Sequence, residues 1–171
     1  MKDIVLLFDT ACIYEIVILN YFLKYTKAEI AFCSLNGKCI TSMEGYSINV
    51  DTKLSEIELC NVRSVIVPGG NVTDIMCDEV YQFLRSINEN GRVVAGICAG
   101  VDVLDKAGIL QNIKSTHSVD LDVVRDNHII TARANGYVDF AIEVGKELEL
   151  FENESDLQET IEFWKYHKSI G

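Results

Sequence analysis

Basic residues are scarce in this sequence, and long apolar runs are missing. Fifteen lysines and arginines stand against twenty-six acidic residues, which gives a net charge of −11. Nucleic acids and anionic membrane surfaces bind clustered cations, so this balance argues against both as partners. No run approaches the ~20 apolar residues of a transmembrane helix, and Asp3 and Asp9 leave too short an apolar stretch for a signal peptide. We therefore expect a cytoplasmic protein.

Paired cysteine motifs are absent as well. The six cysteines include no CxxC pair, and no cysteine and histidine cluster has zinc spacing. A chain of 171 residues that is 49% hydrophobic forms a core large enough to need no disulfide staples. We expect reduced thiols, no metal ion and no cofactor.

Short strand patterns alternate with helical ones along the whole chain. The expected strands lie at 3–8, 28–35, 62–70, 92–99, 113–117, 122–127 and 128–133, and a hairpin at the sheet edge is expected at 39–43 and 46–50. The expected helices lie at 12–25, 72–91, 100–107, 137–150 and 156–168. This alternation predicts an α/β fold with a mainly parallel sheet covered on both faces. No linker interrupts it, so residues 1–171 are predicted to form a single domain.

One strand ends at a cysteine framed by small residues. The segment GICAG, residues 96–100, has the form G-x-C-x-G, which is the thiol counterpart of a nucleophile elbow. Such a strand-to-helix turn holds the sulfur above the first turn of the helix, where free N–H groups and the helix dipole favour a thiolate. The pattern predicts a reactive Cys98 with a lowered pKa. The same short string also fits a core cysteine before a glycine turn.

Two further features would complete such an elbow. The N–H of Ala99, together with Gly69 or Gly70 in VPGG, could donate to an oxyanion. Glu15 lies inside the apolar run CIYEIVILNYF, where a carboxyl is costly to ionise and would donate its proton toward the Cys98 sulfur. Taken alone, VPGG also fits a turn that closes a strand, and Glu15 also fits the wet face of a helix.

These pieces occur in an order that resembles the ThiJ/PfpI superfamily. The matching segments are LLFDTACIYEI, VIVPGG, VVAGICAGVDVLDKAGIL, KSTHS and HIITARANGYVDFAIEV, within residues 3–148. The resemblance implies a flavodoxin-like three-layer α/β/α sandwich, a homodimer and an active site at the elbow. By position, Cys98 would be the nucleophile and Glu15 its protonated partner. The residues implied to line the anion pocket are Gly69, Gly70 and Ala99.

His117 and three departures from the family pattern bear on the chemistry. The segment STHS places His117 where many members have a Thr-His pair, which makes it the candidate base for Cys98, although a structural role at a strand end also fits. PfpI-type proteases have a histidine directly after the cysteine; this chain has Ala99, which argues against a peptidase. Deglycase-type members have a proline where this chain has Val101, and a further histidine in a segment that is shorter here.

Two functions follow from these residues. In the first, a cysteine-dependent enzyme, Cys98 attacks a small electrophile such as an α-oxoaldehyde, a sugar-derived adduct or a small amide, and Glu15 or His117 moves the proton. In the second, a non-catalytic redox-sensing or stress-protective protein, Cys98 is oxidised. A glutamine amidotransferase is excluded because that class needs an H-x-E motif. The residues two positions after the three histidines are Val119, Ile130 and Ser169.

Overall fold

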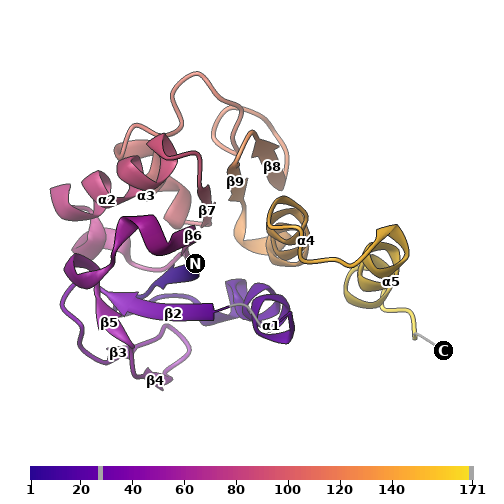
Figure 1. Ribbon diagram of the computed structural model, residues 1–171, viewed down its shortest axis with the longest axis horizontal. Helices are drawn as coiled ribbons and strands as arrows, with labels where there is room; N and C mark the ends of the chain where they lie inside the picture. Colours follow the sequence, from indigo (N-terminus) through magenta and orange to yellow (C-terminus); the bar gives the residue numbers. More distant parts are fainter. Residues whose placement is uncertain (27–28, 170–171) are drawn as a thin grey trace.

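A mainly parallel sheet forms the centre of the protein. The computed structural model describes residues 1–26 and 29–169 (Figure 1). Within these residues the main sheet has the order β5-β2-β1-β6-β7-β9-β8, and the pairing of β8 with β9 is antiparallel while the others are parallel. The strands are β1 (Lys2–Leu6), β2 (Glu29–Ser34), β5 (Thr52–Lys53), β6 (Val62–Val67), β7 (Val93–Ile97), β8 (Val123–Asp126) and β9 (Ile129–Ala132). The predicted mainly parallel sheet is confirmed.

Helices cover both faces of this sheet. On one face α1 and α4 pack against each other, and on the other α2 and α3 pack over β6 and β7 (Figure 1). The helices are α1 (Val17–Tyr25), α2 (Asp78–Glu89), α3 (Gly100–Lys106), α4 (Tyr137–Glu147) and α5 (Glu154–Trp164). Short 3₁₀ turns are η1 (Ile13–Glu15), η2 (Leu54–Glu56), η3 (Leu59–Asn61), η4 (Val72–Ile75) and η5 (Ala134–Gly136). The predicted three-layer α/β/α sandwich is confirmed. In the part of the chain described, no helix combines the length and the apolar character of a membrane span.

The central strands and the helix faces that cover them form the core. Val65, Ile66 and Val67 of β6 are fully buried, because helices cover the strand on both sides and no polar alternation is needed. In α2 the buried residues recur at helical spacing on the face toward the sheet; they are Val80, Phe83, Leu84 and Ile87. The apolar periodicity of the sequence therefore accounts for which faces meet.

A buried carboxylate joins β1 to β6. Asp3 is 1% exposed and accepts hydrogen bonds from Arg63 Nε at 2.9 Å and from Ser64 Oγ at 2.7 Å. Charge-assisted bonds of this kind compensate the cost of burying a charged group. They hold the two parallel strands side by side, and so determine which residues meet beyond their carboxyl ends.

Two helices begin later than predicted. The segment expected as one helix at 12–25 starts with η1, and α1 begins at Val17 because Ile16 has φ −120° and ψ 0°. The helix expected at 72–91 is divided into η4 and α2, since Cys77 between them is extended. Apolar spacing alone does not distinguish a 3₁₀ turn from the first turn of an α-helix.

The hairpin expected at the sheet edge is instead a separate two-stranded sheet. β3 (Ile40–Thr41) and β4 (Ser47–Ile48) pair with each other, and β5 takes the edge position beside β2. The hairpin backbone bonds to the loop after β1: Thr10 N–H donates to the Thr41 carbonyl at 2.7 Å, and Met43 N–H to the Ala11 carbonyl at 3.0 Å. The hairpin therefore supports the loop that leads to Glu15.

The strand predicted at 113–117 is wrong, and this segment consists of turns. Its N–H groups bond to side chains: Lys114 N–H donates to Asp126 Oδ2 at 2.7 Å, and Thr116 N–H to Thr131 Oγ1 at 3.0 Å. These bonds replace the backbone ladder that a strand would need. The strand predicted at 28–35 is β2, and Ala28 lies outside the described residues.

We predict that Gly100→Ala destabilises the fold by at least about 3 kcal/mol, the upper end of what overpacking costs. A Cβ atom on Gly100 would lie 2.1 Å from the Val67 carbonyl oxygen, and backbone cannot move aside cheaply. Gly91→Ala is the control, because Gly91 has φ +64° and open space, and should cost only about 1 kcal/mol. Urea unfolding of both variants measures the difference. Equal losses would contradict the close packing of β6 against α3.

Candidate active site

Cys98 occupies a sharp turn directly after β7. Its φ is 55°, in the left-handed region that residues with a side chain rarely adopt. Its N–H donates to the Ala132 carbonyl at 2.8 Å, which continues the pairing of β7 with β9. Its carbonyl accepts from Val101 N–H at 3.1 Å, which begins α3. The chain thus passes from strand to helix within one strained residue, which is the geometry predicted for an elbow.

Gly69 brings the three predicted parts of the site together. Its N–H donates to Glu15 Oε2 at 2.7 Å. A Cβ atom on Gly69 would lie 2.7 Å from that same oxygen and 2.9 Å from the Cys98 sulfur. Any side chain here would therefore displace the carboxyl or the thiol. Because its N–H is bound to Glu15, Gly69 lines the site without an N–H to offer a ligand.

Gly70 and Ala99 are the remaining candidate donors. Gly70 has φ +128°, and a Cβ atom on it would lie 2.2 Å from the Thr10 carbonyl oxygen, so only glycine fits. Within residues 1–26 and 29–169, the Gly70 N–H has no hydrogen-bond acceptor. The Ala99 N–H interacts with the Cys98 sulfur and acts to lower the pKa of its thiol. The Ala99 N–H therefore lies at the sulfur, and the unpaired Gly70 N–H belongs to the residue after the glycine that adjoins it.

Glu15 is a buried carboxyl with one oxygen unpaired. Its residue is 1% exposed, and within the described residues Oε1 has no hydrogen-bond partner. Burial raises the pKa of Glu15, while the Gly69 N–H opposes this by stabilising the carboxylate. Since Oε2 accepts from Gly69, a proton on the neutral carboxyl would sit on Oε1.

The pKa of Cys98 differs from the prediction made from the helix dipole. Burial raises the pKa of the Cys98 thiol, and the Glu15 carboxylate and Asp102 add to this, against the Ala99 N–H. The prediction that the pKa of the Cys98 thiol is lowered is therefore wrong when the neighbouring Glu15 is ionised. The short helix α3 contributes less than desolvation and two carboxylates. When Glu15 holds its proton, its charge no longer opposes the thiolate.

His117 lies beside the elbow helix rather than in hydrogen-bond contact with the sulfur. Its Nε2 is 3.3 Å from Asp102 Oδ1, and its side chain is 41% exposed. Asp102 stands one helical turn after Cys98 in α3. Within the described residues no hydrogen bond joins His117 to Cys98. The structure thus joins Cys98, Glu15, Gly69, Gly70 and Ala99, and places His117 at the border of this group through Asp102.

Sequence reasoning missed three neighbours of the site. Asp102 follows Cys98 at the i+4 spacing of one helix face, a signal that was available. Glu44 accepts the Tyr14 N–H at 2.8 Å and acts to raise the pKa of Glu15, but it lies in the hairpin whose position was not predicted. Cys12 donates its N–H to the Gly69 carbonyl at 2.9 Å, although the sequence suggested only the start of a helix there.

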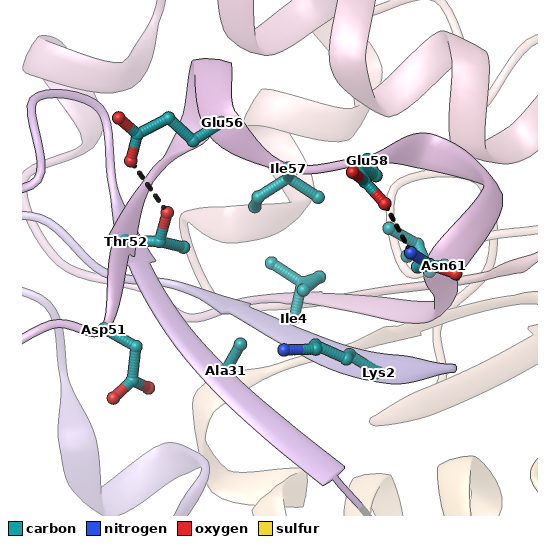
Figure 2. A pocket seen from close by; sticks show the side chains of 10 residues that line it. Lys2, Ile4, Ala31, Asp51, Thr52, Glu56, Ile57, Glu58 and Asn61 are labelled. Atoms are coloured by element: carbon teal, nitrogen blue, oxygen red, sulfur yellow. Dashed lines mark hydrogen bonds between the residues drawn. The ribbon is translucent and has the colours of Figure 1, made fainter.

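A separate cavity lies near the amino-terminal ends of β1 and β6. Its volume is about 260 Å³, and Ile4, Ala31 and Ile57 point into it (Figure 2). Four of the surrounding polar side chains bond in two pairs: Thr52 Oγ1 donates to Glu56 Oε2 at 3.2 Å, and Asn61 Nδ2 donates to Glu58 Oε2 at 2.6 Å. None of the elbow residues lines this cavity.

Within residues 1–26 and 29–169, no group of three or more His, Cys, Asp or Glu could hold a metal ion.

Comparisons with known proteins agree with this architecture. The model of the DJ-1/PfpI family matches residues 1–147. Deglycase TK1284 from Thermococcus kodakarensis is 26% identical over 152 residues, which cover 80% of this chain and 92% of that protein. Deglycase PfpI from Pyrococcus furiosus is 30% identical over 117 residues, which cover 67% of this chain and 69% of that protein. Among solved structures, the DJ-1 superfamily protein Atu0886 from Agrobacterium tumefaciens has a TM-score of 0.87 at 23% identity, covering 98% of this chain and 100% of its own.

We predict that Glu15→Gln removes a loss of stability that the wild type shows as pH rises. The folded pKa of Glu15 is raised above the unfolded value of about 4.3, so the folded state holds an extra proton between the two values. Stability therefore falls as pH rises through that window. The free energy of unfolding of the variant minus that of the wild type should rise there, by at most about 1.4 kcal/mol per pH unit. Urea unfolding at a series of pH values measures it.

Glu44→Gln provides the matched control with the opposite sign. Burial opposes ionisation of Glu44, but the Tyr14 N–H and the Ser42 hydroxyl outweigh it and hold its pKa below the usual value. Its stabilisation is present above the unfolded pKa and is lost as pH falls through the folded one. The free energy of unfolding of Glu44→Gln minus that of the wild type should therefore decrease as the pH rises. Curves of the same sign for the two variants would contradict a neutral, buried Glu15.

Proposed function

This chain belongs to the DJ-1/PfpI family, and from that premise we propose that it is a cysteine-dependent enzyme acting on small electrophiles in the cytoplasm. Cys98 is the proposed nucleophile. The observation that carries the proposal is the meeting of a strained elbow cysteine, a buried carboxyl and an unpaired backbone amide around Gly69. The two relatives named as deglycases support chemistry on carbonyl compounds or their adducts.

The proposed reaction begins with an α-oxoaldehyde such as methylglyoxal. The Cys98 thiolate attacks the aldehyde carbon and forms a hemithioacetal. The N–H groups of Gly70 and Ala99 hold the developing oxyanion, which the proton of Glu15 then neutralises. Transfer of a proton and the electron pair from the first carbon to the second gives a thioester. Water hydrolyses this thioester to a 2-hydroxy acid and releases the thiol.

His117 is the proposed base for the carbon-bound proton. Its Nε2 lies 3.3 Å from Asp102 Oδ1, which orients the ring as the third member of a cysteine, histidine and acid set. Its partial exposure suits proton exchange with solvent. Within the described residues His117 makes no hydrogen bond to Cys98, so we assign this pair to the proton on the substrate and Glu15 to the thiol proton.

A redox-sensing or stress-protective protein is the second candidate. The observation that favours it is that His117 bonds to Asp102 and makes no hydrogen bond to Cys98 among the described residues. Oxidation of a thiol to sulfenic or sulfinic acid needs no general base. The same elbow could therefore serve without turnover.

We predict that Cys98→Ser loses methylglyoxal turnover and alkylation by iodoacetamide at this position. Cys77→Ser is the matched control, since Cys77 is also half-buried but lies before α2, and it should keep both. His117→Ala should retain alkylation while its kcat falls by about 10²–10⁴-fold, the usual contribution of general acid and base catalysis. Release of lactate, followed by chromatography, measures turnover.

Two outcomes would decide against this enzyme. Alkylation of Cys98 without lactate formation by the wild type would favour the redox candidate. A Cys98 that iodoacetamide cannot reach in the folded protein would overturn both functions.

We also propose that the protein is a homodimer whose interface includes the exposed stripe on α1. The stripe consists of Val17, Tyr21 and Tyr25 of α1, which are exposed and spaced to share one helix face, together with the exposed Tyr14 in the preceding turn η1. Contiguous apolar patches of this kind support association. Since Tyr14 adjoins Glu15, a second copy would lie near the entrance to the site.

We predict that Val17→Glu converts the dimer to a monomer. A carboxylate at the first residue of α1 suits the helix dipole, so the helix is retained while the interface is lost. Leu121→Glu is the control, because Leu121 is equally exposed and lies outside α1. Sedimentation equilibrium should give twice the chain mass of 19.2 kDa for the wild type and the control, and the chain mass for Val17→Glu. A wild type with the mass of one chain would contradict the dimer.

A further inference from the structure

Cys12 is a second thiol at the site that the proposed reaction does not use. It stands between β1 and η1, is half-buried, and donates its N–H to the Gly69 carbonyl at 2.9 Å. Gly69 is also the residue that adjoins Cys98, since a Cβ atom placed on it would lie 2.6 Å from Cys98 Cβ and 2.9 Å from Sγ. Both cysteines therefore border the same glycine.

Electrostatic coupling agrees with this placement. Burial raises the pKa of Cys12 to about 11, and the charges of Glu15 and Cys98 add to the rise. Cys33 is buried in β2, and Cys39 and Cys60 are exposed in other segments. Cys77 precedes α2. Of the six thiols, Cys12 is the one that the structure places at the elbow with Cys98.

We propose that Cys12 is the resolving cysteine of Cys98 and closes a Cys12–Cys98 disulfide after a hydroperoxide has oxidised Cys98. The inference rests on the proposed function in one respect, which is that Cys98 is a reactive thiol. In the first step the Cys98 thiolate attacks a peroxide oxygen, the O–O bond breaks, and the thiol becomes a sulfenic acid while the peroxide becomes water or an alcohol. In the second, the Cys12 sulfur attacks Cys98 Sγ, the S–O bond breaks, and water leaves with the proton of the Cys12 thiol.

The charges of the site order these two steps. Burial and the negative charges of the Cys98 thiolate and of Glu44 keep Cys12 protonated, so peroxide reacts first at Cys98. Conversion of the Cys98 thiolate to a neutral sulfenic acid removes one of these charges, and the pKa of Cys12 falls.

The disulfide would give the site a reversible resting form. A sulfenic acid that is not resolved proceeds with more peroxide to sulfinic acid, which thiols do not reduce. A disulfide between Cys12 and Cys98 stops this and is opened again by a dithiol. The nucleophile is then blocked under oxidising conditions and recovered afterwards.

The test treats the reduced full chain with one molar equivalent of hydrogen peroxide and maps its peptides without reduction. The wild type should lose the mass of two hydrogen atoms and yield a linked peptide that contains Cys12 and Cys98, and dithiothreitol should reverse both. Cys12→Ser should instead accumulate a dimedone adduct at Cys98, followed by several-fold more sulfinic acid than the wild type forms. Cys77→Ser is the matched control and should behave as the wild type.

Other outcomes of the same experiment would contradict the Cys12–Cys98 disulfide. A wild type that yields no linked peptide and forms sulfinic acid at Cys98 as fast as Cys12→Ser overturns the inference. Methylglyoxal turnover by the reduced wild type, measured in parallel, separates this failure from that of the proposed enzyme. Turnover without a linked peptide overturns the inference alone, and a linked peptide without turnover overturns the enzyme alone. A Cys98 that iodoacetamide does not alkylate in the reduced protein overturns both.

Discussion

The close approach at Gly69 is the constraint on which the site depends. Its N–H binds Glu15, its carbonyl accepts the N–H of Cys12, and its missing side chain leaves room for Cys98. These residues follow β1, β6 and β7, which are neighbours in one parallel sheet. Parallel strands end at a common edge, so three distant segments of the sequence meet beyond it. A methyl group at this glycine would separate them.

Desolvation is the second constraint, and it acts on an acidic site. Burial raises the pKa of both Glu15 and Cys98, and the neighbouring acids Glu44 and Asp102 strengthen the effect. A negative charge on the thiol disfavours one on the carboxyl, and the reverse, so the pair tends to keep one proton between the two groups. The Ala99 N–H acts in the other direction and favours the thiolate of Cys98. In the proposed reaction, the same balance that hinders a permanent thiolate would provide the proton.

Much of the fold followed from patterns along the chain, and the errors share one cause. The central strands of the parallel sheet and the five helices were predicted because apolar spacing records which faces are buried, whereas the two-residue edge strand β5 was missed. The 3₁₀ turn η1, the separate β3–β4 hairpin and the turns at 113–117 were not. Each depends on hydrogen bonds from backbone N–H groups to another segment of the chain, such as the bond from Thr116 N–H to the Thr131 side chain at Oγ1. The local spacing of apolar residues does not indicate such bonds. Cys98 was predicted to be the elbow residue because so sharp a turn needs small residues at fixed positions on either side of it.

The sequence by itself predicted a mainly parallel sheet covered on both faces and a carboxyl in an apolar segment from local spacing, while the three-layer sandwich and the choice of Cys98 as an elbow rather than a core cysteine rested also on the resemblance to a family. Tertiary structure alone decided that the Gly69 N–H binds Glu15, that His117 pairs with Asp102, and that Cys12 borders the same glycine as Cys98. It also reversed the expected direction of the Cys98 pKa. The reason is that desolvation and hydrogen bonding depend on distances between segments far apart in the chain, which only the packed sheet sets.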